Sequence, residues 1–193
     1  MSRRAQPEPP GLQHVLVAGG TPADWWSMSA GAWGERLAML ADQASGAGAS
    51  WLTVRPMGSD HPAPAGSASP AIEPPPWPVG PVAIGGVTVV VDDEADARRR
   101  METVLAALAA RGATAATLTE EQLGAAFADP APVEPDLAVL FGPDDTLPSS
   151  LSWELAYAEV VFIAASWCDV DPIVVKAAVA EYFTRNRRFG AVT

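Results

Sequence analysis

The sequence contains little of what disulfide-bonded, metal-binding and nucleic-acid-binding proteins depend on. Its 193 residues include one cysteine, Cys168, so an internal disulfide and a cysteine-rich metal site are excluded. Only two histidines, His14 and His61, are available as imidazole ligands. Lysine and arginine together number 12 against 23 aspartates and glutamates, which gives a formal net charge of −11. Nucleic acid is not expected as a partner, because phosphate binding needs clustered cations.

Long apolar runs are also missing. No stretch approaches the roughly 18 consecutive apolar residues that suggest a membrane-spanning helix. The first residues, MSRRAQPEPPGLQ, carry charge but no apolar segment, unlike a secretory signal. We therefore expect a cytoplasmic protein without a membrane span, whose membrane association would come through a complex and its lipid product.

The chain does have enough apolar residues, 49%, for one globular domain. Residues 1–11 are predicted to form a flexible polar tail, and residues 12–193 a single domain. The stretch from about 58 to 82 contains eight prolines, each of which lacks a backbone donor and has a fixed φ. That stretch is predicted to be a long loop.

Short apolar segments alternate with helical patterns along the domain. Strands are predicted at 12–18, 50–55, 87–91, 136–141 and 160–164. Helices are predicted at 31–46, 94–111, from 119 onward, at 149–158 and from 171 onward. The 94–111 helix is expected to place Met101, Val104, Leu105 and Leu108 on one side. Because the strands are continuously apolar, the pattern indicates an α/β domain with a mainly parallel central sheet flanked by helices.

Three local features have a chemical interpretation beside a plainer structural one. The turn at 19–21 (GGT) follows the first strand as a phosphate loop would, but it lacks the usual glycine spacing and lysine and better fits a strand-ending turn. The pairs Asp92-Asp93 and Asp144-Asp145 could bind Mg²⁺, although adjacent carboxylates more often solvate a turn. The run Arg98-Arg99-Arg100 is interpreted as a solvated helix face.

The chain ends in a basic segment, with Arg185, Arg187 and Arg188 followed by Phe189-Gly190. Basic residues at the end of a helix complement its dipole. Alternatively, the segment presents an arginine on a short tail to an anion. Physical reasoning from the residues leaves both interpretations open.

The C-terminal third resembles the cis-prenyltransferase family, which includes undecaprenyl diphosphate synthase. The matching segments are DLAVLFGP from Asp136, WELAYAE from Trp153, WCDV from Trp167 and RNRRFG from Arg185. More faintly, HVLVAGGTPADWW from His14 and LTVR from Leu52 are similar to the family's first two strands. The resemblance implies the cis-prenyltransferase fold.

The resemblance also identifies what is missing. The family's catalytic aspartate, which binds Mg²⁺, falls on Gly20, and the following Asn-Gly-Arg, which helps hold the allylic diphosphate, falls on 22–24 (PAD). Two arginines that bind isopentenyl diphosphate fall on Leu140 and Thr146, and a nearby serine on Pro148. Burying a diphosphate without cations is unfavourable by several kcal/mol. The chain alone is therefore expected to be inactive, with no catalytic residue or metal ligand of its own.

This pattern of loss is similar to that of Nogo-B-receptor-type subunits, the accessory halves of eukaryotic two-component cis-prenyltransferases. Those subunits carry P-D-L-x-x-x-F-G-P, present here at 135–143, and a terminal R-x-G, here Arg188-Phe189-Gly190. The resemblance implies that Arg188, Phe189 and Gly190 contact isopentenyl diphosphate in trans, in the active site of a catalytic homologue. It further implies a heterodimer or heterotetramer in which Mg²⁺ is bound mainly by that partner.

Three further residues are interface candidates by analogy with the family: Trp153, Glu159 and Trp167. Large aromatic side chains suit an interface, but a core position for the tryptophans is equally compatible with the sequence. The resemblance places Glu159 where catalytic homologues carry a glutamate near the shared Mg²⁺ site, so a metal role and a structural role are both alternatives for this residue.

The sequence predicts a non-catalytic accessory subunit that completes a partner's site for condensing isopentenyl diphosphate with an allylic diphosphate. A stand-alone pseudoenzyme that regulates by binding a lipid or a protein is the alternative, and a transferase with rearranged chemistry is a third. The terminal R-F-G favours the first over the second, because a regulator does not need a tail that serves a neighbour's active site. The missing aspartate and arginines disfavour the third.

Overall fold

The central element is a six-stranded sheet in the order β3-β4-β2-β1-β5-β6. The computed structural model describes residues 11–57, 74–142 and 147–185. The strands are β1 (His14–Gly19), β2 (Trp51–Arg55), β3 (Val82–Ile84), β4 (Val87–Val91), β5 (Leu137–Phe141) and β6 (Glu159–Ile163). Every neighbouring pair is parallel except β3 and β4, which are antiparallel. The prediction of an α/β domain with a mainly parallel sheet is confirmed.

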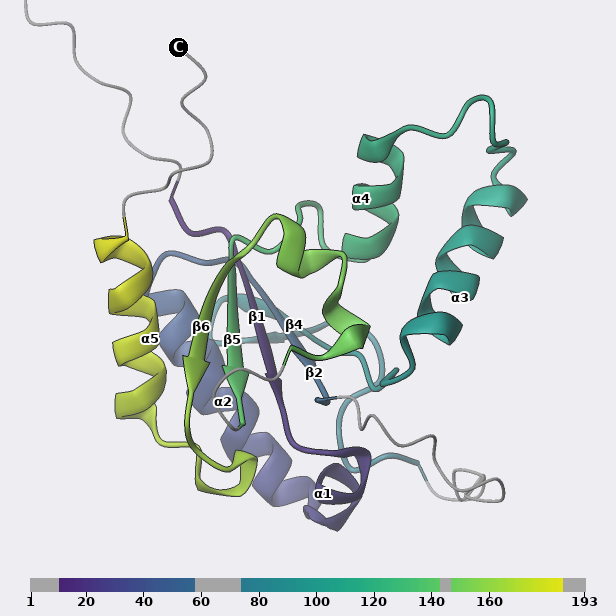
Figure 1. Ribbon diagram of the computed structural model, residues 1–193. Coiled ribbons are helices and arrows are strands. Elements are labelled where there is room, and N and C mark those ends of the chain that lie inside the picture. Colours follow the sequence, from purple (N-terminus) through teal and green to yellow (C-terminus); the bar gives the residue numbers. More distant parts are fainter. Residues whose placement is uncertain (1–10, 58–73, 143–146, 186–193) are drawn as a thin grey trace, which may run out of the picture.

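The described residues form five α-helices beside this sheet. They are α1 (Pro22–Ser27), α2 (Ala30–Gly46), α3 (Ala97–Ala110), α4 (Glu120–Ala128) and α5 (Pro172–Thr184). Helices α2 and α5 pack together against one face of the sheet, whereas α3 and α4 contact each other and project beside the sheet (Figure 1). Among the described residues, no helix is long and apolar enough to cross a membrane.

The two faces of the sheet belong to separate apolar clusters, which explains why the strands are continuously apolar. The face toward α2 and α5 carries the larger cluster, in which the strand residues are Val15, Val17, Leu52, Val54, Val87, Val89, Val91, Leu137, Val139, Phe141 and Val161. The opposite face carries Leu16, Ala18, Ala138 and Leu140, covered by Leu151. The alternation along β1 thus assigns successive residues to different layers.

The predicted helix at 149–158 is wrong. The segment instead forms two short 3₁₀ turns, η1 (Ser149–Leu151) and η2 (Glu154–Ala156). Serine at 149, 150 and 152 disfavours a continuous α-helix, because its hydroxyl competes for nearby backbone groups. Tight turns at this point also place Glu154 in the interior, where it is 3% exposed.

The predicted loop at 58–82 is only partly described, since 58–73 lie outside the described residues. Its last part is not a free loop: Trp77 is 5% exposed and packs against Trp25, Trp26 and Trp33, and Val82 begins the unpredicted strand β3. A two-residue turn at 85–86 (GG), with φ of +57° and +85°, joins β3 to β4. Two glycines between apolar segments are a hairpin signal that could have predicted this strand.

The buried stripe of α3 also differs from the prediction. Val104 and Leu108 are buried as expected, but Met101 and Leu105 are 38% and 43% exposed. Arg100 takes their place in the stripe and is 6% exposed, which contradicts its interpretation as part of a solvated face. The reason is helical spacing, because steps of four residues place position 100 on the side of 104 and 108.

Candidate functional site

The crevice outside the C-terminal ends of β1 and β5 is the place to look for a site. Strand order reverses there: β2 and β4 lie on one side of β1, and β5 and β6 lie on its other side. Open parallel sheets bind ligands at such a switch point. Gly19 and Phe141 are paired at the C-terminal ends of β1 and β5, and Gly20 directly follows β1. The structure therefore places Gly20, predicted to replace a catalytic aspartate, where a catalytic side chain would be expected.

Trp167, the first residue of η3 (Trp167–Asp169), fills the space beside Gly20. Its side chain is 3% exposed, and its ring centroid lies 6.1 Å from that of Trp25 and 6.2 Å from that of Phe141. A Cβ atom on Gly20 would lie 2.7 Å from Cδ1 of Trp167, closer than atoms in contact can approach. Gly20 also has φ +69°, which strains any residue with a side chain. Position 20 thus has no room for an aspartate, and these residues do not fit Mg²⁺.

Arg36 of α2 holds Trp167 from the other side. Its guanidinium lies 4.7 Å from the centroid of the Trp167 ring, within range of a cation–π interaction. It also donates hydrogen bonds to the backbone carbonyl oxygens of Trp167 and Cys168. Burial lowers the pKa of Arg36, and the neighbouring Cys168 and Asp169 oppose that shift. Contacts to both the ring and the backbone keep Trp167 in the crevice.

The start of α1 carries a carboxylate where the resemblance places an arginine. Asp24 accepts hydrogen bonds from the backbone N–H of Thr21 at 2.7 Å and from its hydroxyl at 2.8 Å, and Thr21 caps the helix in return. A negative charge at this end of the helix repels phosphate. The turn at 19–21 is therefore better explained as the end of a strand and the cap of α1 than as a phosphate loop.

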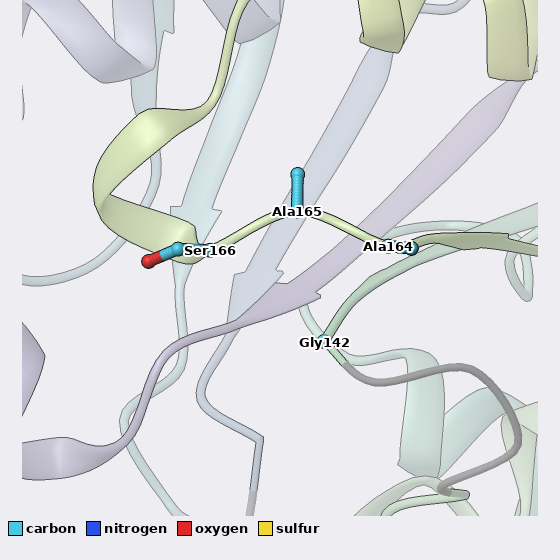
Figure 2. A pocket seen from close by; sticks show the side chains of 4 residues that line it. All are labelled: Gly142, Ala164, Ala165 and Ser166. Carbon is cyan, nitrogen blue, oxygen red and sulfur yellow. The ribbon is translucent and has the colours of Figure 1, made fainter.

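An open pocket of about 300 Å³ lies beside the same edge of the sheet, lined by Gly142, Ala164, Ala165 and Ser166 (Figure 2). None of these four carries a charge, and the Ser166 hydroxyl accepts a hydrogen bond from the N–H of Cys168. In the part of the chain that the structure describes, no three His, Cys, Asp or Glu side chains gather as metal ligands. The four described lining residues offer no cation for a diphosphate.

A buried ionic cluster lies where β2 and β4 end. Arg55 contacts Glu154 at 2.6 Å (Nη1 to Oε1) and Asp92 at 2.8 Å (Nη2 to Oδ2). Arg100 donates to both carboxylate oxygens of Glu154 and to the carbonyl oxygen of Ser150. Burial and the nearby Arg55 cation lower the pKa of Arg100, whereas Glu154 and Asp92 raise it. Two cations and two anions of the described residues pair with one another, and Nε of Arg55 is left without a hydrogen-bond partner among them.

Sequence reasoning missed this cluster. The sequence pattern places Arg55 in the second strand, Asp92 in a carboxylate pair and Glu154 in the WELAYAE segment, and it does not connect the three residues. The available signal is a charged residue at the end of a buried strand, as Arg55 is in β2, or directly after one, as Asp92 is after β4, because a buried charge needs a partner.

We expect Glu154→Gln to lower the free energy of unfolding by about 1–3 kcal/mol, because it leaves two buried guanidinium groups without their shared anion. Urea denaturation measures this change. Glu94→Gln is the matched control, since Glu94 pairs with the exposed Arg99 at 3.7 Å and its loss is expected to change stability by less than about 1 kcal/mol. Equal stability of the two variants would contradict the expected importance of the buried cluster.

His14 lies in the same layer as this cluster and is 1% exposed. One ring nitrogen is 2.8 Å from the carbonyl oxygen of Val133 and the other 2.9 Å from the hydroxyl of Thr53. The neutral ring satisfies both contacts when Nδ1 donates to Val133 and Nε2 accepts from Thr53. Burial lowers the pKa of His14 below its ordinary value of 6.5.

Stability should therefore fall as the pH is lowered below about 6.5, because the unfolded chain then binds a proton at His14 that the folded chain does not. The contribution is complete above the unfolded pKa and is lost toward the folded one. Urea denaturation at pH 7.5, 6.5 and 5.5 should give a steeper decline for the wild type than for His14→Gln, which keeps polar contacts without titrating. Parallel pH dependences would count against this assignment.

The structure separates the three interface candidates. Trp153 stacks on Phe127 with 5.0 Å between ring centroids and donates to Glu134 at 2.7 Å, so it joins α4 to the turn at η2. Trp167 lies in the core at the crevice, which agrees with the core alternative for this residue. Glu159 is the first residue of β6 and therefore lies at the opposite end of that strand from Trp167; its side chain is partly exposed.

Several predicted positions lie outside the described residues. They are Asp144-Asp145, Thr146, Arg187, Arg188, Phe189 and Gly190. The last described residue, Arg185, lies at the end of α5. Of the two isopentenyl-diphosphate arginine positions, only Leu140 is described, and it is buried in β5 at 1% exposure.

Comparisons with known proteins point to one family. A family model described as putative undecaprenyl diphosphate synthase matches residues 90–190. Isoprenyl transferase 2 of Bradyrhizobium diazoefficiens is 38% identical over 77 residues, 40% of this chain and 31% of the relative. The isoprenyl transferase of Rhizobium meliloti is 30% identical over 116 residues, 58% of this chain and 47% of the relative. The chain thus spans less than half of the length of these curated relatives.

Solved structures agree at the level of the fold. A probable undecaprenyl diphosphate synthase from Campylobacter jejuni matches with a TM-score of 0.60 and 14% identity, over 93% of this chain and 98% of that one. Lavandulyl diphosphate synthase from Lavandula x intermedia, solved with dimethylallyl diphosphate, matches with a TM-score of 0.59 and 14% identity, over 92% and 97%.

Proposed function

Because the chain belongs to the undecaprenyl diphosphate synthase family of cis-prenyltransferases, we propose that it is a non-catalytic accessory subunit of a two-component enzyme. Its partner is a homologue that keeps the aspartate absent here. The complex condenses isopentenyl diphosphate with an allylic diphosphate, and the partner holds most of the Mg²⁺ ligands. This chain contributes its C-terminal Arg188-Phe189-Gly190 to the partner's site.

The main support for a non-catalytic role is the position of Trp167 in the crevice beside Gly20. Where a catalytic family member is expected to present a carboxylate, Gly20 presents none and Trp167 occupies the room. Asp24 adds a negative charge and Leu140 an apolar side chain where arginines are expected. Ionising an allylic diphosphate needs positive charge, and these described residues supply none.

The position of the last described residue, Arg185, supports action in trans. Arg185 hydrogen-bonds to Glu159 and Val160 at the beginning of β6, whereas Gly20 and Trp167 follow the C-terminal ends of β1 and β6. Figure 1 shows that α5 ends on the side where the parallel strands begin. Three extended residues move the Cα atom of Arg188 by at most about 11 Å from that of Arg185. The five residues of β6 alone span about 13 Å. Arg185, from which the tail continues, therefore lies at the opposite end of the strands from this chain's own crevice, which favours a role of the tail in another subunit.

The outer side of β6 is the proposed docking surface for the partner. This strand lies at the end of the sheet, with one neighbour, β5, among the described residues. Phe162 on β6 is 38% exposed, and Tyr157 just before it is 53% exposed. An open strand edge beside exposed aromatic side chains is suited to a protein interface.

Prenyl transfer with labelled isopentenyl diphosphate and farnesyl diphosphate tests the proposal. The chain, a catalytic homologue encoded in the same genome, and their mixture are assayed separately. Activity only in the mixture, or far higher there, is expected. Activity of this chain alone would contradict the proposal, and no effect of mixing would favour the alternative of a lipid- or protein-binding regulator.

A further inference from the structure

Helices α3 and α4 form an arm, residues 97–128, whose apolar side chains pack with one another rather than on the sheet. The core of this arm consists of Val104, Leu108 and Phe127, which are buried together with partly buried neighbours from the same residue range. Among the described residues, Trp153 is the one member of this cluster from outside the arm, and no strand residue belongs to it. The arm therefore has a small core of its own.

Helix α3 shares little apolar surface with the rest of the domain. It buries Arg100, Val104 and Leu108, whereas Met101 and Leu105 are exposed. In Figure 1, α3 and α4 stand beside the sheet, in contrast to α2 and α5, which cover its face. Segments with few buried apolar contacts open at a lower free energy than the core of a domain does. The arm is such a segment.

The 3₁₀ segment at 149–156 lies between the arm and the sheet. Leu151 packs with the strand residues of the smaller cluster, whereas Trp153 stacks on Phe127 of the arm with 5.0 Å between ring centroids. Directly after this segment, the Tyr157 hydroxyl donates to the carboxylate of Glu120 at the start of α4. The arm thus rests mainly on this segment and not on the strands.

A buried ion pair fastens the arm to that segment. The Arg100 guanidinium donates to both carboxylate oxygens of Glu154 and, at 3.1 Å, to the carbonyl oxygen of Ser150. The side chains of Arg100 and Glu154 are 7% and 2% exposed. Arg100 belongs to the arm and Glu154 to the segment that stays with the sheet, so the two can separate only when the arm moves away.

We propose that the arm opens from the sheet as one unit and that the Arg100–Glu154 pair is its latch. In the open arm, Arg100 exchanges Glu154 for water. Glu154 keeps Arg55, at 2.6 Å, and Arg55 keeps Asp92, at 2.8 Å, because none of these three residues belongs to the arm. The desolvation of buried ions offsets most of their attraction, so releasing one of them to water has a modest cost. This conformational device belongs to the chain itself and does not depend on the accessory function.

Native-state hydrogen exchange of the full-length chain, under conditions where rates report the opening equilibrium, tests the proposal. The amides of α3 and α4 should share one opening reaction and exchange at least about tenfold faster than the slowest amides of β1 and β5, after correction for intrinsic rates. Low concentrations of urea should accelerate the arm amides less, because opening the arm exposes less surface than global unfolding does. Equal protection and equal urea dependence in arm and strands would overturn the proposal.

A core variant on the other face of the sheet separates local from global opening. Leu37 of α2 is 1% exposed in the larger apolar cluster and remains packed when the arm opens. Leu37→Ala should therefore accelerate the slowest strand amides about thirtyfold or more and leave the arm amides within about twofold of the wild type. Val179→Ala on α5 is a milder variant of the same cluster, for use if Leu37→Ala does not fold. Equal acceleration of arm and strands would overturn the proposal.

Glu154→Gln tests the latch. In the closed arm this variant leaves Arg100 buried without its anion, so the amides of α3 and α4 should exchange about five- to 150-fold faster. Glu94→Gln is the matched control, because it removes only an exposed ion pair with Arg99, and it should leave these amides within about twofold of the wild type. Arm exchange that is the same in Glu154→Gln and the wild type would overturn the role of this pair as the latch.

Discussion

Arg188→Ala should lower kcat/KM of the two-subunit complex on the order of 10²- to 10³-fold, whereas assembly of the complex should be unchanged. An arginine presents a fixed fork of donors that matches two oxygens of a phosphate, and its contribution is greatest where charge develops in a water-poor site. Under the proposed function this side chain acts in the partner's site, so the loss should appear although every catalytic residue of the partner is intact. Steady-state assays with isopentenyl diphosphate and an allylic diphosphate measure it.

Two neighbouring variants make this result specific. Arg187→Ala removes the same charge one residue earlier, and we expect it to reduce activity no more than a fewfold. Arg188→Lys keeps the charge but loses the two-pronged geometry, so it should fall between the wild type and Arg188→Ala. Turnover that is unaffected by Arg188→Ala, in a complex of normal affinity, would exclude a trans-acting arginine.

Gly20→Asp should destabilise the domain by about 2–5 kcal/mol and create no activity. A left-handed φ strains a residue with a side chain by about 1–2 kcal/mol, and overpacking a filled core adds about 1–3 kcal/mol. The substitution restores the residue type that the family uses, but φ is +69° here and Trp167 occupies the space that a side chain needs. Urea denaturation and a prenyl-transfer assay of the variant alone measure both expectations.

Gly112→Asp separates the two causes of this loss. Gly112 also has a left-handed backbone, with φ +88°, but a Cβ atom there would meet nothing within 4 Å. Gly112→Asp should therefore lower the free energy of unfolding only by the part that backbone strain causes. Adding Trp167→Ala to Gly20→Asp should relieve the clash, so that the double variant is less destabilised than the sum of the two single changes. Detectable condensation by Gly20→Asp alone would show that the crevice can still ionise substrate.

Much of the fold follows from local sequence, as two elements illustrate. In α5, Asp171 caps the helix before Pro172, and Val175, Val179 and Tyr182 form the buried stripe that the spacing predicts. Strand β4 has the predicted bounds, because a continuous run of branched apolar residues suits a strand covered on both faces. Local pattern failed at 149–158, where serines and the burial of Glu154 outweighed helical periodicity.

The sequence by itself determined the α/β class and the mainly parallel sheet, and its resemblance to the family predicted the loss of the aspartate and arginines, because composition, periodicity and motif letters are properties of short segments. Only the tertiary structure decided what occupies the vacated positions. Trp167 fills the space at Gly20, and Glu154 pairs with Arg55, 99 residues away. Likewise, Arg185 at the end of the last helix binds Glu159 on the edge strand. Such contacts join residues far apart in the chain, and their partners are fixed by how strands and helices pack rather than by any local pattern.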